Sequence, residues 1–245
     1  AQCPHDGDTT TLAEALLWKS GAIASPGSVE KGTTVCDFDP MAKAYGHSLG
    51  SSLVNFAYED MRIHLIDTPG MPDFAGQSIA ALAAVETAVV VINAQNGIEL
   101  NTTRMMKWAK TRGLCRMIVV NKIDADNVDL PGLLRKIQDH FGKECLPINL
   151  PAHDRKDVVD CFFTPDGDAD FVGVKAAHTA IVEQVVEVDE KLMATYLEKG
   201  EVSPEELHEP LERAMREGHL VPVVFCSAKT GVGVQELLEV IVKLM

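Results

Sequence analysis

Three short polar loops each follow directly on an apolar run, and this arrangement constrains the fold of the 245-residue chain most strongly. The runs are 62–66, 115–120 and 221–226, and the loops begin at Asp67, Asn121 and Ser227. Short apolar runs bounded by turn residues indicate strands, and the stretches between them have the spacing of helices. Alternating strands and helices build a mostly parallel sheet with helices on both faces, whose loops meet at one edge. The chain is therefore expected to be an α/β protein with its ligand site at that edge.

The pattern also predicts where the individual elements lie. Strands are expected at 53–58, 63–66, 88–93, 117–120, 146–148 and 221–226, and helices at 12–20, 77–85, 101–112, 130–141 and 233–244. In the stretch between these groups we expect a strand at 158–163, a turn at 165–168 and one long helix at 174–198 with Ile181, Val185, Val188 and Leu192 along one stripe. Ser203, Pro204 and the acids after them predict the start of another helix.

Asn121, Lys122 and Asp124 form the pattern N-K-x-D at the end of the apolar run 115–120. A carboxylate in that place accepts two parallel hydrogen bonds from N1 and N2 of guanine. Adenine lacks these donors, so the wrong base leaves a desolvated charge unpaired. Taken alone, the four residues fit a solvated strand end equally well, and the other two loops decide between the interpretations.

The two remaining loops favour a nucleotide site. In Asp67-Thr68-Pro69-Gly70, a carboxylate at Asp67 would hold the water shell of Mg²⁺, and Gly70 leaves room for its amide to approach a terminal phosphate. Ser227-Ala228-Lys229 is placed to brace a base from its other side. Together the loops predict guanine nucleotide, GTP or GDP with Mg²⁺, as the ligand.

The order D-T-P-G, N-K-x-D, S-A resembles the G domain of translational GTPases, and residues 27–39 are similar to the approach to switch I in elongation factor G. The resemblance covers essentially the whole chain and is closest to divergent elongation factor G-like paralogues. It implies a P-loop GTPase three-layer sandwich at 1–150 and 221–245, with an α+β subdomain inserted at 151–220 that elongation factor Tu lacks. It also implies hydrolysis of GTP to GDP and phosphate, and a cytoplasmic role in protein biosynthesis on the ribosome.

The same resemblance assigns the site residues. The expected nucleotide-binding residues are Asp8, Thr9, Thr10, Thr11, Asn121, Lys122, Asp124, Ser227, Ala228 and Lys229. The expected Mg²⁺ ligands are Thr10, Ser48 and Asp67. Gly70 and Met71 stand at the catalytic positions.

The phosphate loop departs from the pattern G-x-x-x-x-G-K-[ST], whose amides and Lys neutralise phosphates. Aligned on Thr10, the pattern puts Cys3 and Asp8 at the glycines and Thr9 at the Lys. A register one residue earlier restores Gly7 but puts Asp8 at the Lys, so neither register supplies the cation. Charge-assisted hydrogen bonds contribute about 1.5 to 3 kcal/mol each, so replacing attraction by repulsion predicts GTP binding weakened by about a hundredfold or more.

The catalytic positions depart from the family as well. Met71 stands where the family has a His that orients the attacking water, and a thioether cannot donate a hydrogen bond. Losing such a group costs about 10² to 10⁴ in rate. The switch I pattern R-G-I-T becomes Tyr45-Gly46-His47-Ser48, in which Ser48 keeps a hydroxyl for Mg²⁺; Met71 and His47 are expected to be packing or surface side chains. Two functions stay open: a GTPase with weak hydrolysis, and a pseudo-GTPase that serves as an interaction module with little or no turnover.

Composition limits the partners. The net charge of −14, with 36 acidic residues against 22 basic ones, argues against non-specific binding to nucleic acid. The sequence lacks the run of about 18 apolar residues that a membrane span needs, so no membrane contact is expected. The six cysteines are scattered without C-x-x-C spacing, which favours reduced thiols in a cytoplasmic protein. The acids of 174–198 are interpreted as a solvated face in preference to a docking surface, and a monomer is expected.

Both ends of the sequence indicate a fragment. A GTPase sheet has a central strand that leads into the phosphate loop, and only Ala1 and Gln2 precede Cys3. At the other end, Met245 closes an expected helix where the family continues into further domains. We therefore expect the first strand and the downstream domains of a longer factor to be missing from this sequence.

Overall fold

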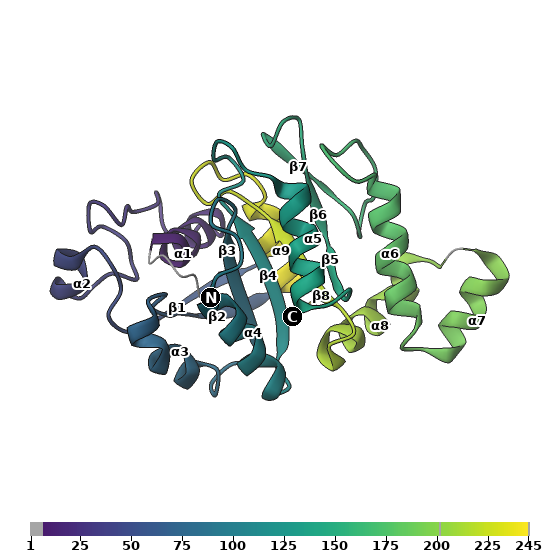
Figure 1. The fold of residues 1–245 in the computed structure, drawn as a ribbon, viewed down its shortest axis with the longest axis horizontal. Coiled ribbons are helices and arrows are strands. Elements are labelled where there is room, and N and C mark those ends of the chain that lie inside the picture. Colours follow the sequence, from purple (N-terminus) through teal and green to yellow (C-terminus); the bar gives the residue numbers. More distant parts are fainter. Residues whose placement is uncertain (1–6, 201, 245) are drawn as a thin grey trace.

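The structure, a computed structural model, describes residues 7–200 and 202–244 (Figure 1). Its strands are β1 (Ser52–Tyr58), β2 (Met61–Asp67), β3 (Thr87–Asn93), β4 (Cys115–Asn121), β5 (Cys145–Pro147), β6 (Asn149–Ala152), β7 (Asp157–Asp160) and β8 (Val221–Phe225). Its helices are α1 (Gly7–Lys19), α2 (Pro40–Tyr45), α3 (Ala75–Ala81), α4 (Leu100–Thr111), α5 (Leu130–Phe141), α6 (Val174–Val186), α7 (Glu190–Lys199), α8 (Pro204–Glu217) and α9 (Val234–Leu244), with a short 3₁₀ helix, η1 (Pro72–Phe74).

A parallel sheet in the order β3-β4-β8-β5 forms the centre of the molecule. Every residue of β8 and nearly every residue of β4 is buried. A strand covered on both faces is apolar throughout, which explains why these runs show no alternation. Figure 1 shows α4 and α5 in front of the sheet and α9 behind it, where α9 packs against α1. The predicted α/β fold, a mostly parallel sheet between two layers of helices, is confirmed.

The first two strands form a separate antiparallel hairpin that runs from the pair Ser52 and Asp67 to the pair Tyr58 and Met61. Within the described residues β2 does not pair with β3. A cavity of about 620 Å³ lies between them, lined mainly by apolar side chains of β2, α3 and β3. The expected strand leading into the phosphate loop, and the loop's residue Cys3, lie outside the described residues.

The prediction of one long helix at 174–198 is wrong in one respect, because the structure has two helices there, α6 and α7. Asp189 adopts an extended backbone (φ −138°, ψ 109°), and its carboxylate accepts the amides of Lys191 and Leu192 at 3.0 Å each. An Asp in this geometry is a strong N-cap, so it ends α6 and starts α7. Arg213 of α8 donates to the Val188 carbonyl and to Asp189, which fixes the break.

Smaller differences also have local causes. The strand expected at 158–163 ends at Asp160, because the Asp160 carboxylate accepts the amides of Phe162 and Thr164 and turns the chain. The predicted start of α8 is confirmed by a reciprocal capping box between Ser203 and Glu206. The helix expected at 77–85 occupies Ala75–Ala81, and the one expected at 12–20 already begins at Gly7. Among the helices of the described part, none has both the length and the apolar character needed to cross a membrane.

Candidate nucleotide-binding site

The loops after β4 and β8 are joined by side chains that the sequence singled out. Asn121, at the end of β4, is buried, and its Oδ1 accepts the amides of Lys122 at 2.8 Å and Ala228 at 2.9 Å. The Ser227 hydroxyl donates to Oδ1 of Asp124 at 2.6 Å. The structure therefore brings N-K-x-D and S-A-K together at the carboxyl edge of the sheet.

The Ser227 hydroxyl orients the Asp124 carboxylate. Its oxygen also accepts the Thr230 amide at 3.1 Å, so its proton is left to point at Asp124. Lys122 is half-buried and has a left-handed backbone (φ 63°), while Lys229 is exposed. Burial, reinforced by the charge of Asp124, raises the pKa of the nearby Cys226 thiol, which keeps it protonated. The five cysteines in the described residues are all free thiols.

Two buried side chains hold the carbonyls of the D-T-P-G loop. Ser78 of α3 donates to the Pro69 carbonyl at 3.1 Å, and Asn101 Nδ2 of α4 donates to the Gly70 carbonyl at 2.7 Å. The end of the loop is thus anchored to two helices, Pro69 to α3 and Gly70 to α4. Sequence reasoning missed both residues, although Asn101 gives a signal: it lies four residues before the buried Met105, on the inner face of α4.

Thr10 and Asp67 form the core of the expected Mg²⁺ site. The Thr10 hydroxyl donates to Asp67 Oδ2 at 2.7 Å, and the Thr9 side chain also hydrogen-bonds to this carboxylate. Burial raises the pKa of Asp67, and the charge of Asp37 raises it further. The other oxygen, Asp67 Oδ1, is buried and has no hydrogen-bond partner within the described residues. An uncompensated buried carboxylate oxygen beside a hydroxyl is a donor set that fits Mg²⁺.

Ser48 reaches this site only through another residue. Its hydroxyl donates to Oδ1 of the buried Asp37 at 3.3 Å, and Oδ2 of Asp37 accepts from the Thr34 hydroxyl at 2.8 Å. Two of the three expected metal ligands are therefore in contact, and the third contacts a neighbouring carboxylate. No group of three or more His, Cys, Asp or Glu side chains arranged for a metal occurs in the part of the chain that the structure describes.

Glu14 tethers the segment that resembles the approach to switch I. This α1 residue is 2% exposed, and its carboxylate accepts the amides of Gly27, at 2.8 Å, and Val35. One buried charge is therefore compensated by two backbone donors from the same loop. Sequence reasoning missed this role; the available signal was a lone acid within the apolar segment 12–17.

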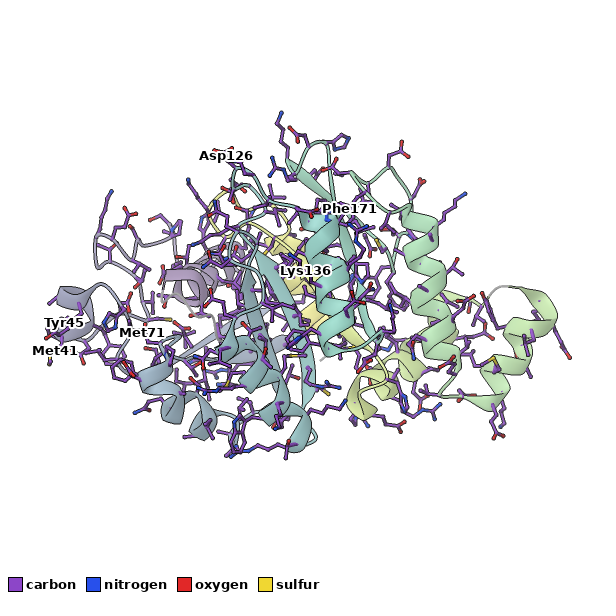
Figure 2. All side chains as sticks on the ribbon, in the orientation of Figure 1. Met41, Tyr45, Met71, Asp126, Lys136 and Phe171 are labelled. Carbon is purple, nitrogen blue, oxygen red and sulfur yellow. The ribbon has the colours of Figure 1, made fainter. Side chains whose placement is uncertain are left out.

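The expected catalytic and phosphate-loop positions lie as follows. Met71 is half-buried and precedes η1 without a side-chain capping bond. Figure 2 shows it on the side of the molecule that carries Met41 and Tyr45, away from Asp126 in the loop after β4. The His47 ring lies against Tyr45 and Phe74, with ring centroids 5.9 and 6.1 Å away. Asp8 lies in the first turn of α1; after it come Thr9 and Thr10, which are buried, and the half-buried Thr11.

Comparisons with known proteins found one matching family and several relatives. The pattern of the family described as Elongation factor Tu GTP binding domain matches residues 5–245. An elongation factor G-like protein of Mycobacterium tuberculosis (strain H37Rv) is 35% identical over 251 residues, covering 97% of this chain and 35% of that protein. The tetracycline resistance protein TetO of Streptococcus mutans is 30% identical over 237 residues, and the match covers 96% of this chain and 35% of TetO.

A solved structure agrees with these relatives. A crystal structure of a protein from Thermus thermophilus superposes on the whole chain with a TM-score of 0.89 and 33% identity, and the match covers 39% of that protein's chain. The chain thus spans 35% of the length of the curated relatives named above.

Proposed function

This chain belongs to the elongation factor Tu GTP-binding domain family, as a G domain of the elongation factor G-like translational GTPases, and we propose that it binds guanine nucleotides but hydrolyses GTP weakly. The observation that carries the proposal is the 2.6 Å hydrogen bond from Ser227 to Asp124. It ties together two loops that are far apart in sequence, in the arrangement that guanine recognition requires. The Asp124 carboxylate accepts from the base, while the 227–229 loop covers the base from the other side.

The phosphate side depends on Mg²⁺. Thr10 and Asp67 would hold the ion, with Ser48 brought in when Asp37 releases it, and Thr11 lies next to them on α1. When bound there, Mg²⁺ would supply positive charge that offsets the charge of the phosphates. Ser78 and Asn101 fix the Pro69 and Gly70 carbonyls, which sets the direction of the intervening amide toward the terminal phosphate.

Binding of the nucleotide's phosphate groups is proposed to be weak. Thr9 takes the place of the family Lys and directs its hydroxyl to Asp67. In the sequence, Asp8 is an acid at a position where a phosphate loop needs donors. Met71 cannot orient water as a His does. GTP binding and turnover are therefore both expected to be low.

The second candidate is a pseudo-GTPase, an interaction module with little or no turnover. The bond from Thr9 to Asp67 favours it, because that side chain fills the Lys position without supplying charge. In both cases we propose the ribosome as partner, the cytoplasm as location, a monomeric state and a separate subdomain at 151–220.

A thermal-shift series separates the two candidates. The chain is heated with GDP, GTP or ATP and Mg²⁺, and phosphate release is then measured with and without ribosomes. Stabilisation by guanine nucleotides and release stimulated by ribosomes support the enzyme. Stabilisation without release supports the pseudo-GTPase, and stabilisation by ATP equal to that by GTP would refute guanine recognition.

A further inference from the structure

The hairpin formed by β6 and β7 is attached to the strand that leads into the Ser227 loop. The buried Asn149 side chain donates through Nδ2 to the Phe225 carbonyl at 3.0 Å and accepts the Phe225 amide on Oδ1 at 2.7 Å. A side-chain amide thus pairs with the backbone as a neighbouring strand would. The last residue of β8 is held in place by the hairpin.

The same hairpin also reaches the N-K-x-D loop. Arg155, in the turn between β6 and β7, donates through Nη1 to the Ala125 carbonyl at 2.7 Å and to the Ile123 carbonyl at 3.4 Å. These two carbonyls flank Asp124 on either side. The Arg155 side chain is 28% exposed, so the contact is largely shielded from water.

The turn that carries Arg155 is held in an uncommon conformation. His153, Asp154 and Arg155 are all left-handed, with φ of 53°, 57° and 64°. Non-glycine residues rarely adopt this region, and a run of them persists only where the surroundings fix it. Asp170 fixes this turn, because its carboxylate accepts the amides of Asp154 at 2.9 Å and Arg155 at 2.8 Å. The Asp170 amide in turn donates to the Pro151 carbonyl at 2.8 Å, so Asp170 is itself bonded to β6.

We propose that Arg155 is a positioning residue for guanine recognition, held by Asp170 and acting through Asp124. By bonding the carbonyls before and after Asp124, its guanidinium prevents the backbone from rotating the carboxylate away from the base. The proposal rests on the proposed function, since it concerns the same base site. It adds that the segment after β5 takes part in base selectivity, through the bonds of Arg155 to the backbone on either side of Asp124.

The test compares GDP with inosine diphosphate, whose base lacks the 2-amino group that Asp124 reads. The affinity ratio of the two measures the Asp124 hydrogen bond and cancels general losses of stability. Arg155→Ala should lower this ratio by about tenfold, as expected for loss of a hydrogen bond to a charged group. Arg155→Lys should give an intermediate ratio, because its ammonium can still donate to these carbonyls but sits on a flexible stem and lacks the fixed geometry of the guanidinium. Asp170→Asn, which weakens the support of the turn, should shift it in the same direction.

The matched control is Arg213→Ala. Arg213 also bonds a carbonyl, that of Val188 at 2.7 Å, but it joins α8 to the break between α6 and α7. Its loss should lower thermal stability and leave the GDP to inosine diphosphate ratio unchanged. A ratio in Arg155→Ala equal to that of the unaltered chain would overturn the proposal.

Hydrogen exchange on the nucleotide-free chain gives an independent readout. In Arg155→Ala the amides of 121–128 should exchange faster, and in Arg213→Ala they should not. If the unaltered chain shows no preference for GDP over ADP, the proposed function fails, and exchange of 121–128 alone then decides the positioning role. Unchanged exchange in Arg155→Ala would contradict that role.

Discussion

The base side and the phosphate side of the site are built in opposite ways. On the base side, Ser227 donates to Asp124 and Asn121 accepts the Ala228 amide, so the protein itself holds the recognition group in place. On the phosphate side, Asp67 is buried with one oxygen that no described donor satisfies, and its pKa is raised by that burial. Under the proposed function, the preorganised base side would keep its selectivity without help, whereas the phosphate side would need the charge of Mg²⁺.

The largest expected effect is at the base. Asp124→Asn removes the charged acceptor for two guanine donors, so GDP affinity should fall by about a thousandfold, at about 1.5 to 3 kcal/mol per bond. Titration calorimetry with GDP measures this. The matched control is Asp126→Asn, two residues further on and exposed, which should bind GDP normally. Equal losses in both variants would place guanine elsewhere.

The phosphate side should respond in the opposite direction. Thr9→Lys combined with Asp8→Gly restores the cation and removes the repulsion, and GTP affinity should rise by about a hundredfold. Asp8→Gly alone removes the repulsion without adding the cation and serves as control. Calorimetry with GTP and Mg²⁺ reads the result. No gain from Thr9→Lys over the control would show that the phosphates lie at a different segment.

Hydrolysis should gain less than binding. On the Thr9→Lys and Asp8→Gly background, Met71→His should raise the rate of phosphate release by about tenfold to a hundredfold, because a His can orient water. Met41→His, on the exposed face of α2, supplies the same side chain away from the loop. Equal rates in the two variants would remove Met71 from the catalytic position.

The smallest expected effect concerns stability. Glu14→Gln turns one of two acceptors into a donor facing a backbone amide, and the free energy of unfolding should fall by about 1 to 3 kcal/mol. Urea denaturation of the nucleotide-free chain measures this, with the exposed Glu30→Gln as control. Base discrimination should not change. A loss of guanine selectivity in Glu14→Gln would mean that the two sides are coupled.

The elements that could be predicted are those specified by local sequence. β4 and β8 are continuous apolar runs, and α8 carries a clear start signal, so the two strands and the start of α8 were predicted to within a few residues, as was α5. β6 was not predicted, because it is short and contains Pro151. The break at Asp189 was missed because the stripe of apolar residues continues across it, whereas the capping bonds that end α6 appear only in three dimensions.

The site was predictable where recognition depends on neighbours in sequence. The loops at 121–124 and 227–229 follow their strands directly, so topology alone brings them together. Glu14, Asn101 and Arg155 act through side-chain contacts with distant backbone, and residue type alone does not specify such partners. The Thr10 to Asp67 contact was predicted only through the family pattern.

Titration calorimetry of the unaltered chain with GDP, GTP and ADP in Mg²⁺ tests the contrast between the two sides most directly. The account predicts that both guanine nucleotides bind, that ADP does not, and that GTP binds with a Kd in the micromolar range or weaker. A submicromolar Kd for GTP, or binding of ADP as strong as that of GDP, would contradict it.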